Sequence, residues 1–169
     1  PPGGACCVGL VVGTFPGGVG ALVHLKVLDV SNNNLAGTLP SGWAPPLGSF
    51  ERLQVFYARE NQISGTLPAS LVSNMSNLRY MMLQHNRLSG SLPTTVGLLK
   101  QLSDLHAYDN ALDQPLPDEI GDMTLLQDLR LQDNKITSTI PASIGNLTRL
   151  RYLDLYNNLM VGDVPAGIV

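Results

Sequence analysis

The hydrophobic positions of this 169-residue chain repeat in a fixed frame. Each unit has apolar residues at regular steps, then an asparagine, another apolar residue, usually a glycine, and an apolar residue followed by proline. Six asparagines mark successive units, and the last four are 24 residues apart: Asn33, Asn61, Asn86, Asn110, Asn134 and Asn158. Self-similarity at this period predicts a solenoid, in which each coil buries its apolar edge only against its neighbours.

The frame also predicts the elements inside each coil. Leu129 and Leu131 alternate with polar residues at period two, which predicts a short strand with two buried side chains. Stacked units would place these strands in a parallel sheet, about 4.8 Å apart. The Leu-x-Gly-x-Ile-Pro stretch predicts a corner, and the glycine-punctuated segment 142–147 predicts a 3₁₀ turn or irregular helix.

The repeated asparagine has a predicted structural role. It follows the strand at the point where the chain must turn inward. Its amide has two donor hydrogens and an acceptor oxygen, so we expect it to bond backbone groups of its own turn and of the next coil. Its loss would leave buried polar groups unpaired, at roughly 1–3 kcal/mol each.

The repeat resembles the plant-type leucine-rich repeat, over a stretch from about Cys6 to Val169. The shared pattern is Leu-x-x-Leu-x-x-Leu-x-Leu-x-x-Asn-x-Leu-x-Gly-x-Leu/Ile-Pro. This resemblance implies an α/β solenoid, a right-handed superhelix with a parallel β-sheet on its concave face and 3₁₀ or irregular turns on its convex face. We expect one domain over residues 1–169, with about six repeats, a partial first repeat and both ends truncated. The resemblance implies a fragment of a receptor-like or secreted ectodomain.

A few positions depart from the pattern. Gln114 and Ser138 replace the glycine, and the small Ala58 and Ala107 occupy one core position. The extra residues in the segment 41–46 predict a local bulge on the outer face.

The apolar run from Cys6 to Leu25 could be mistaken for a signal peptide or a membrane span. Pro16 and five glycines interrupt it, no basic residue precedes it, and it lies in register with the repeats, so we expect a partial coil. Cys6 and Cys7 are adjacent, whereas the resemblance implies cap cysteines that are spaced apart. A buried Cys6 in repeat register is an equally good explanation, and the oxidation state of the two thiols stays open.

Composition excludes several function classes. The chain is 44% hydrophobic and 14% charged, with a net charge of −3, so it lacks the basic footprint that nucleic acids or anionic membranes require. Gly17-Gly18 lacks the Lys-Ser/Thr of a phosphate-binding loop, and the signature motifs of kinases are absent. We find no activated nucleophile, and we therefore expect neither enzymatic activity nor a cofactor.

We expect the strand residues that alternate with the buried leucines to face the concave side and to form four columns across the coils, which we call the column surface. Its members are Asp29, Tyr57, Met82, His106, Arg130 and Asp154; Val27, Val55, Tyr80, Asp104, Asp128 and Tyr152; Ser31, Arg59, Gln84, Tyr108, Gln132 and Tyr156; and Asn32, Glu60, His85, Asp109, Asp133 and Asn157. The columns contain all five tyrosines and every histidine except His24. Tyrosine and arginine are enriched in binding hot spots, although tyrosine is also simply a good strand residue.

We predict that a protein or peptide partner contacts nine of these side chains: Tyr57, Tyr80, His85, His106, Tyr108, Arg130, Tyr152, Asp154 and Tyr156. Arg130 is expected to pair with Asp154 or Asp128. The histidines lie near carboxylates, a combination that can bind metals, but solvated ion pairs explain the pattern equally well and we expect no metal.

Two glycosylation sequons begin at Asn74 and Asn146, both in the segment between the proline and the next strand. Together with the resemblance, they favour an extracellular or cell-surface location. Our hypothesis is a recognition module from a receptor-like protein or receptor kinase, with no membrane span in this sequence. The alternatives are a secreted enzyme inhibitor, a structural surface repeat and an intracellular scaffold.

Overall fold

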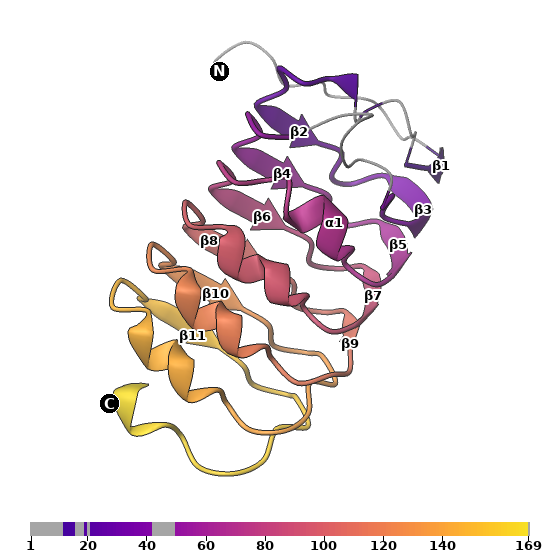
Figure 1. The fold of residues 1–169 in the computed structure, drawn as a ribbon. Coiled ribbons are helices and arrows are strands. Elements are labelled where there is room, and N and C mark those ends of the chain that lie inside the picture. The colour runs from indigo at the N-terminus through magenta and orange to yellow at the C-terminus, as the bar shows by residue number, and fades with distance from the viewer. Residues whose placement is uncertain (1–11, 16–18, 20, 42–49, 169) are drawn as a thin grey trace.

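The computed structural model describes residues 12–15, 19, 21–41 and 50–168. The coils stack in one direction from the N-terminal to the C-terminal end, and each adds one strand to a sheet that runs the length of the stack (Figure 1). The predicted solenoid is therefore confirmed. Cys6, Cys7 and, of the bulge predicted at residues 41–46, all but Ser41 lie outside the described residues.

The longer sheet has six parallel strands in chain order. Equivalent residues pair across it: Leu129 lies opposite Leu105 on one side and Leu153 on the other. This register confirms the two columns that begin at Val27 and Asp29. The strands are β2 (Val27–Asp29), β4 (Val55–Tyr57), β6 (Tyr80–Met82), β8 (Asp104–His106), β10 (Asp128–Arg130) and β11 (Tyr152–Asp154).

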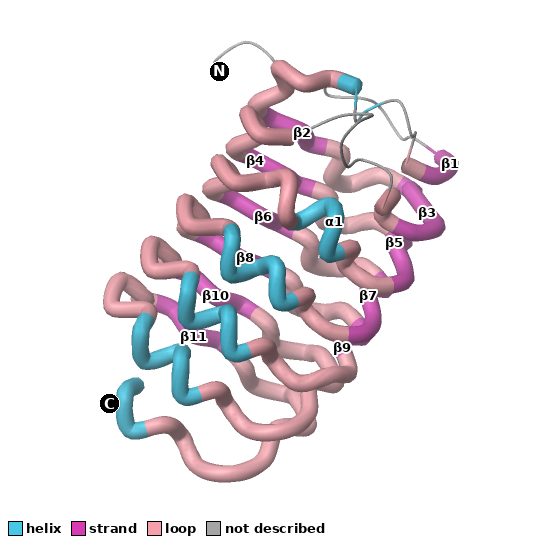
Figure 2. Tube along the Cα trace, viewed as in Figure 1, coloured by secondary structure: helices cyan, strands magenta, loops and turns pink. Residues whose placement is uncertain are grey.

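A second parallel sheet occupies the stretch that the sequence predicted to be only a corner (Figure 2). Gly37 lies opposite Ile63, not opposite the equivalent Gly65, so each strand is displaced by two residues relative to its neighbour. The last strand of this sheet lies in the coil whose glycine is replaced by Gln114. Its strands are β1 (Val12–Thr14), β3 (Asn34–Thr38), β5 (Gln62–Gly65), β7 (Arg87–Gly90) and β9 (Ala111–Leu112).

The glycine of most units adopts a backbone conformation that favours glycine. Gly90 adopts φ +75, and a Cβ atom there would lie 2.8 Å from Cγ2 of Thr66 in the preceding coil. Ser138 occupies the same position in its own coil with φ 69, which is a strained conformation for a residue with a side chain.

Short helices cover the outer side of the coils, as predicted. Among the helices whose bounds the structure describes, one is a single α-helical turn and four are 3₁₀ helices: α1 (Ala69–Val72), η2 (Thr94–Leu98), η3 (Asp118–Asp122), η4 (Ala142–Asn146) and η5 (Ala166–Ile168). An extended proline precedes each of the first four, and its fixed φ directs the chain into the helix. The helices approach closely at Gly121, where a Cβ atom would lie 2.3 Å from the carbonyl oxygen of Ser143.

The repeated leucines form one continuous core between the two sheets and the helices. Leu105 and Leu129 of the longer sheet and Leu102 and Leu126 before it are fully buried. At the N-terminal end the ring of Phe15 packs edge-on against Phe56, with 6.5 Å between the ring centroids. The core thus fixes every strand, and with it every column, to its neighbours.

Candidate functional site

The asparagine ladder sets the geometry of the site because it holds the end of each strand. Asn134 is 8% exposed; its Nδ2 donates to the carbonyl oxygens of Leu131 (3.1 Å) and Ala107 (3.0 Å), and its Oδ1 accepts from the N–H of Leu112 (3.0 Å). The bonds reach the preceding coil, so the prediction that they reach the next coil is wrong.

The same arrangement recurs along the ladder. In each case Nδ2 donates to a carbonyl oxygen of the asparagine's own turn and to one of the preceding coil, and Oδ1 accepts a hydrogen bond from an N–H of that preceding coil. The residues are Asn61, Asn86, Asn110 and Asn158. Asn33 donates to Val30 and Ser31 in its own turn. The predicted structural role is confirmed.

The residue before each asparagine has a left-handed backbone. These are Asn32, Glu60, His85, Asp109, Asp133 and Asn157, with φ between 50 and 57. The two columns that begin at Ser31 and Asn32 therefore lie beyond the strand ends, and the prediction that they alternate within the strands is wrong. Asparagine and aspartate tolerate this conformation, which explains most of the residue choices in the last column.

The tyrosines lie on the solvent side of the longer sheet, as predicted. Tyr152 and Tyr156 are 59% and 60% exposed, Tyr80 is 37% exposed, and Tyr57 and Tyr108 are half-buried. Burial raises the pKa of Tyr57, and the carboxylate of Asp133 raises the pKa of Tyr156. Both phenols are therefore neutral hydrogen-bonding groups near neutral pH.

Arg130 makes a two-pronged contact with Asp128, one of its two predicted partners. Its Nε lies 2.9 Å from Oδ1 and its Nη2 lies 3.0 Å from Oδ2. This hydrogen bonding raises the pKa of Arg130. The guanidinium also lies 5.5 Å from the ring centroid of Tyr152, a cation–π distance.

Asp104, His106 and Asp128 bring three possible metal ligand atoms within 4.8 Å of one another. Nε2 of His106 lies 3.3 Å from Oδ2 of Asp128 but has no hydrogen-bond geometry with it. A divalent cation there would compete with Arg130 for both oxygens of Asp128, and we assign Asp128 to the ion pair with Arg130.

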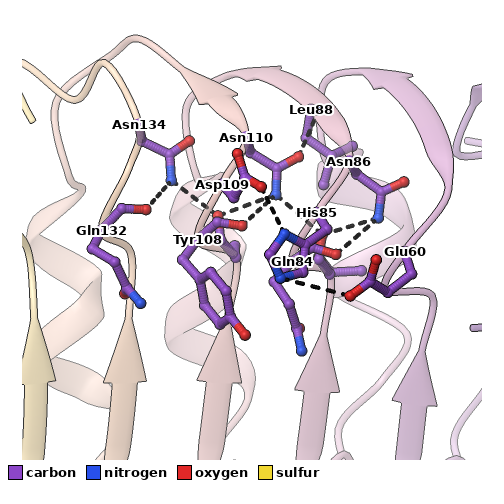
Figure 3. Close-up of polar contacts among 12 residues, drawn as sticks. Glu60, Gln84, His85, Asn86, Leu88, Tyr108, Asp109, Asn110, Gln132 and Asn134 are labelled. Atoms are coloured by element: carbon purple, nitrogen blue, oxygen red, sulfur yellow. Dashed lines mark hydrogen bonds and ion pairs between the residues drawn. The ribbon is translucent and has the colours of Figure 1, made fainter. Parts of the chain in front are cut away.

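His85 lies between two carboxylates, as the sequence indicated (Figure 3). Its Nδ1 is 2.6 Å from Oδ2 of Asp109 and its Nε2 is 3.7 Å from Oε1 of Glu60. Its ring meets Tyr108 edge-on, with 5.1 Å between centroids, and the ring of His106 lies 6.2 Å from Tyr108. Tyr108 is therefore flanked by both histidines of the column surface.

Two hollows indent the column surface, and Tyr108 lines both. One, of about 430 Å³, is lined by Tyr57, Arg59, Met82, Gln84, His106, Tyr108 and Arg130. The other, of about 670 Å³, includes His85, Tyr108, Gln132, Asp133 and Tyr156. A further hollow of about 490 Å³, beside Ile144, Leu150 and Ile168, lies outside the four columns.

Sequence reasoning missed two glutamines of this surface. Gln84 and Gln132 are only 4% and 7% exposed, although the equivalent Arg59 and Tyr156 are exposed. Their polarity gives no sign of burial, so only the packing around Tyr108 identifies them.

The two predicted glycosylation residues differ in exposure. Asn146 is exposed at the end of η4. Asn74 is half-buried, and its Nδ2 donates to the carbonyl oxygen of Ser70 at 2.6 Å. Modification at either residue stays a prediction. In the part of the chain that the structure describes, no helix is both long and apolar enough to cross a bilayer.

Comparison with solved structures places this geometry among plant receptors. The ectodomain of the receptor kinase GASSHO1/SCHENGEN3 from Arabidopsis thaliana, solved with CASPARIAN STRIP INTEGRITY FACTOR 2, is 37% identical over 93% of this chain, with a TM-score of 0.86. The plant peptide hormone receptor RGFR1, solved with RGF2, is 31% identical over 94% of this chain, with a TM-score of 0.87. The Arabidopsis receptor kinase HAESA, solved with the peptide hormone IDA and the co-receptor SERK1, is 25% identical over 93% of this chain, with a TM-score of 0.85.

This chain covers only 18%, 25% and 26% of those three chains. A search of curated proteins gives no match. The model of a leucine-rich repeat region matches residues 40–160, and a single leucine-rich repeat matches residues 24–45. The repeat pattern, the stacked parallel sheets and these matches agree, and the chain belongs to the leucine-rich repeat family.

Proposed function

We propose that the column surface binds an extended peptide, and that this chain is part of the extracellular, non-enzymatic recognition region of a receptor-like protein. One observation carries the proposal: Tyr108 stands at the junction of two hollows, between the rings of His85 and His106. An aromatic side chain in this position is a typical binding anchor. The similar GASSHO1/SCHENGEN3, RGFR1 and HAESA structures, each solved with a ligand, support a ligand-binding role.

The stacked core makes this surface a rigid platform. The buried leucines and the asparagine ladder hold the strands before any ligand arrives. Little conformational entropy would then be lost on association, so that more of the contact energy appears as affinity. The aromatic side chains would supply most of that energy, and the charged side chains would set specificity.

The charge of the surface indicates the kind of peptide. The four columns contain seven acidic side chains and only two arginines, Arg59 and Arg130. With neutral histidines this gives a net charge of −5, and one of the two arginines is already paired with Asp128. Charge complementarity favours a peptide that carries lysine or arginine.

Selection from a phage-displayed dodecapeptide library on the immobilised chain tests this proposal. We expect enrichment of basic peptides, and a loss of affinity of about 100-fold when Tyr108→Ala is combined with Tyr156→Ala. Arg130 is left unchanged because its removal would leave the buried Asp128 unpaired. The matched control is Leu98→Ala with Arg149→Ala, two exposed residues outside the columns.

The control should bind like the unmodified chain. A selection that enriches no peptide, or a Tyr108→Ala/Tyr156→Ala variant that still binds with unchanged affinity, would remove the column surface as the binding site.

A further inference from the structure

We propose that the side-chain amides of Gln84 and Gln132 bind the main chain of the peptide at two residues three positions apart, on either side of Tyr108. This inference rests on the proposed peptide-binding function and specifies how the same surface would recognise its ligand. Main-chain recognition would leave the ligand side chains at these two residues free to vary.

The burial of the two amides is the first argument. The Oε1 atoms of Gln84 and Gln132 are buried, and neither finds a hydrogen-bond partner among the described residues. A buried amide oxygen without a partner destabilises the folded state, so most buried polar groups in proteins are paired. Two such oxygens in one column are therefore groups that a ligand could satisfy.

The fold does not need a glutamine at this position. The backbone of each turn is bonded by the asparagine ladder, including Asn86 and Asn134 beside these glutamines. Other coils place Arg59 or Tyr156 at the equivalent position, with the same backbone conformation in the residue that follows. A purely structural role does not explain the two amides.

Position is the second argument. Gln84, Tyr108 and Gln132 follow β6, β8 and β10, and their side chains extend side by side from consecutive coils (Figure 3). Gln84 lines the smaller hollow of the column surface, Gln132 lines the larger one, and Tyr108 lines both. Rotation about the soft terminal torsion of a glutamine exchanges Oε1 and Nε2, so either atom can turn toward a hollow.

The spacing matches an extended peptide. Neighbouring strands lie about 4.8 Å apart, so two side chains separated by two coils are about 10 Å apart. An extended chain rises about 3.3 Å per residue, and three residues also span about 10 Å. With Oε1 turned toward the hollow, each glutamine amide can accept a hydrogen bond from the N–H of one ligand residue. A peptide that crosses the strands over Tyr108 would therefore meet both amides in register.

Amide-to-ester replacement along a dodecapeptide selected by the unmodified chain tests this directly, because each ester removes one N–H and keeps the side chain. We expect the ester to weaken binding at two peptide positions, three residues apart. At each of them the affinity measured by calorimetry should fall about 3–10-fold. In the Gln84→Met variant, the ester at one of these positions should no longer lower the affinity. In the Gln132→Met variant, the same should hold for the ester at the other position. Each variant should melt at an unchanged or higher temperature, because an unpartnered amide has been removed.

Gln114→Met is the matched control, since Gln114 is exposed and bonds only the neighbouring Asp113. It should leave both the affinity and the ester profile unchanged. Three results would overturn the inference and leave the proposed function standing. The ester could still lower the affinity in both variants, the scan could show no two sensitive positions three residues apart, or both variants could melt at a lower temperature. A library that yields no peptide at all would overturn both.

Discussion

The Oδ1 atom of Asn134 accepts a hydrogen bond of 3.0 Å from the backbone N–H of Leu112 in the preceding coil. Its Nδ2 donates to Ala107 of that coil at 3.0 Å. The side chain thus joins two coils through backbone groups that water does not reach, and one amide satisfies a donor and an acceptor together.

The substitution Asn134→Ala should lower the free energy of unfolding by about 1–3 kcal/mol, because the buried N–H of Leu112 would lose its partner. The carbonyl of Ala107 would keep its hydrogen bond from Nδ2 of Asn110. Urea unfolding followed by circular dichroism measures the change. The exposed Asn146→Ala is the control and should change stability by less than about 0.5 kcal/mol. Equal effects at the two positions would show that the ladder contributes little.

A methyl group at Gly121 should be poorly tolerated. A Cβ there would lie 2.3 Å from the backbone oxygen of Ser143, whereas a Cβ at Gly145 would lie 3.2 Å from its nearest neighbour, Gly167. Overpacking of this kind typically lowers the stability of the folded state by about 1–3 kcal/mol, and Gly121→Ala should lower it by about 3 kcal/mol or more. Thermal unfolding compares the two alanine variants, and a milder effect at Gly121 than at Gly145 would contradict the close packing of η3 on η4.

Ser138→Gly should stabilise the protein. Ser138 has φ 69, where the equivalent Gly65, Gly90 and Gly162 have φ 74, 75 and 85. The left-handed conformation costs a residue with a side chain about 1–2 kcal/mol, and the entropy of a free glycine offsets part of the relief. We expect a net gain of about 0.5–1 kcal/mol in urea unfolding. A loss would mean that the serine side chain stabilises this corner.

The pH dependence of stability should include a contribution from Tyr57. Burial raises its pKa above the usual 10. The folded state therefore favours the neutral phenol, and this stabilisation is complete below pH 10 and is lost as the pH rises through the folded-state pKa. Absorbance titration at alkaline pH should show a late-titrating phenol that is missing from Tyr57→Phe. Tyr156 also has a raised pKa, so its Tyr156→Phe variant is titrated alongside. If Tyr57→Phe removes absorbance change from the ordinary range of tyrosine titration and leaves the late phase intact, the assignment is contradicted.

Much of the fold follows from the repeat period. The spacing of the leucines and asparagines predicts the coils, the longer sheet, the outer 3₁₀ helices and the columns through Val27 and Asp29, because a strand residue faces the same side in every identical coil. The second sheet was missed because its stretch contains glycine and proline, which indicate a turn in isolation. This stretch forms strands because it pairs with the same stretch of the neighbouring coil, in a register displaced by two residues.

The candidate site was less predictable, because its key features depend on contacts between coils. Tyr108 and Arg130 lie on the solvent side of the longer sheet, as the sequence predicted, and Asp128 is one of the two partners predicted for Arg130. It could not show that Gln84 and Gln132 are buried, because the same column contains exposed residues in other coils. The left-handed backbone at His85 was also missed, although asparagine, aspartate and histidine are enriched in this conformation and occupy five of the six positions of its column.

Hydroxyl-radical footprinting of the chain, with and without a saturating selected dodecapeptide, tests most directly whether the column surface is where the ligand binds. Mass spectrometry measures the oxidation of individual side chains. Tyr156 of the column surface and Leu98 of η2, which lies outside it, are both exposed and reactive. We predict that the peptide protects Tyr108 and Tyr156 and leaves Leu98 as reactive as before. Protection of Leu98 with unchanged oxidation of both tyrosines would contradict the account.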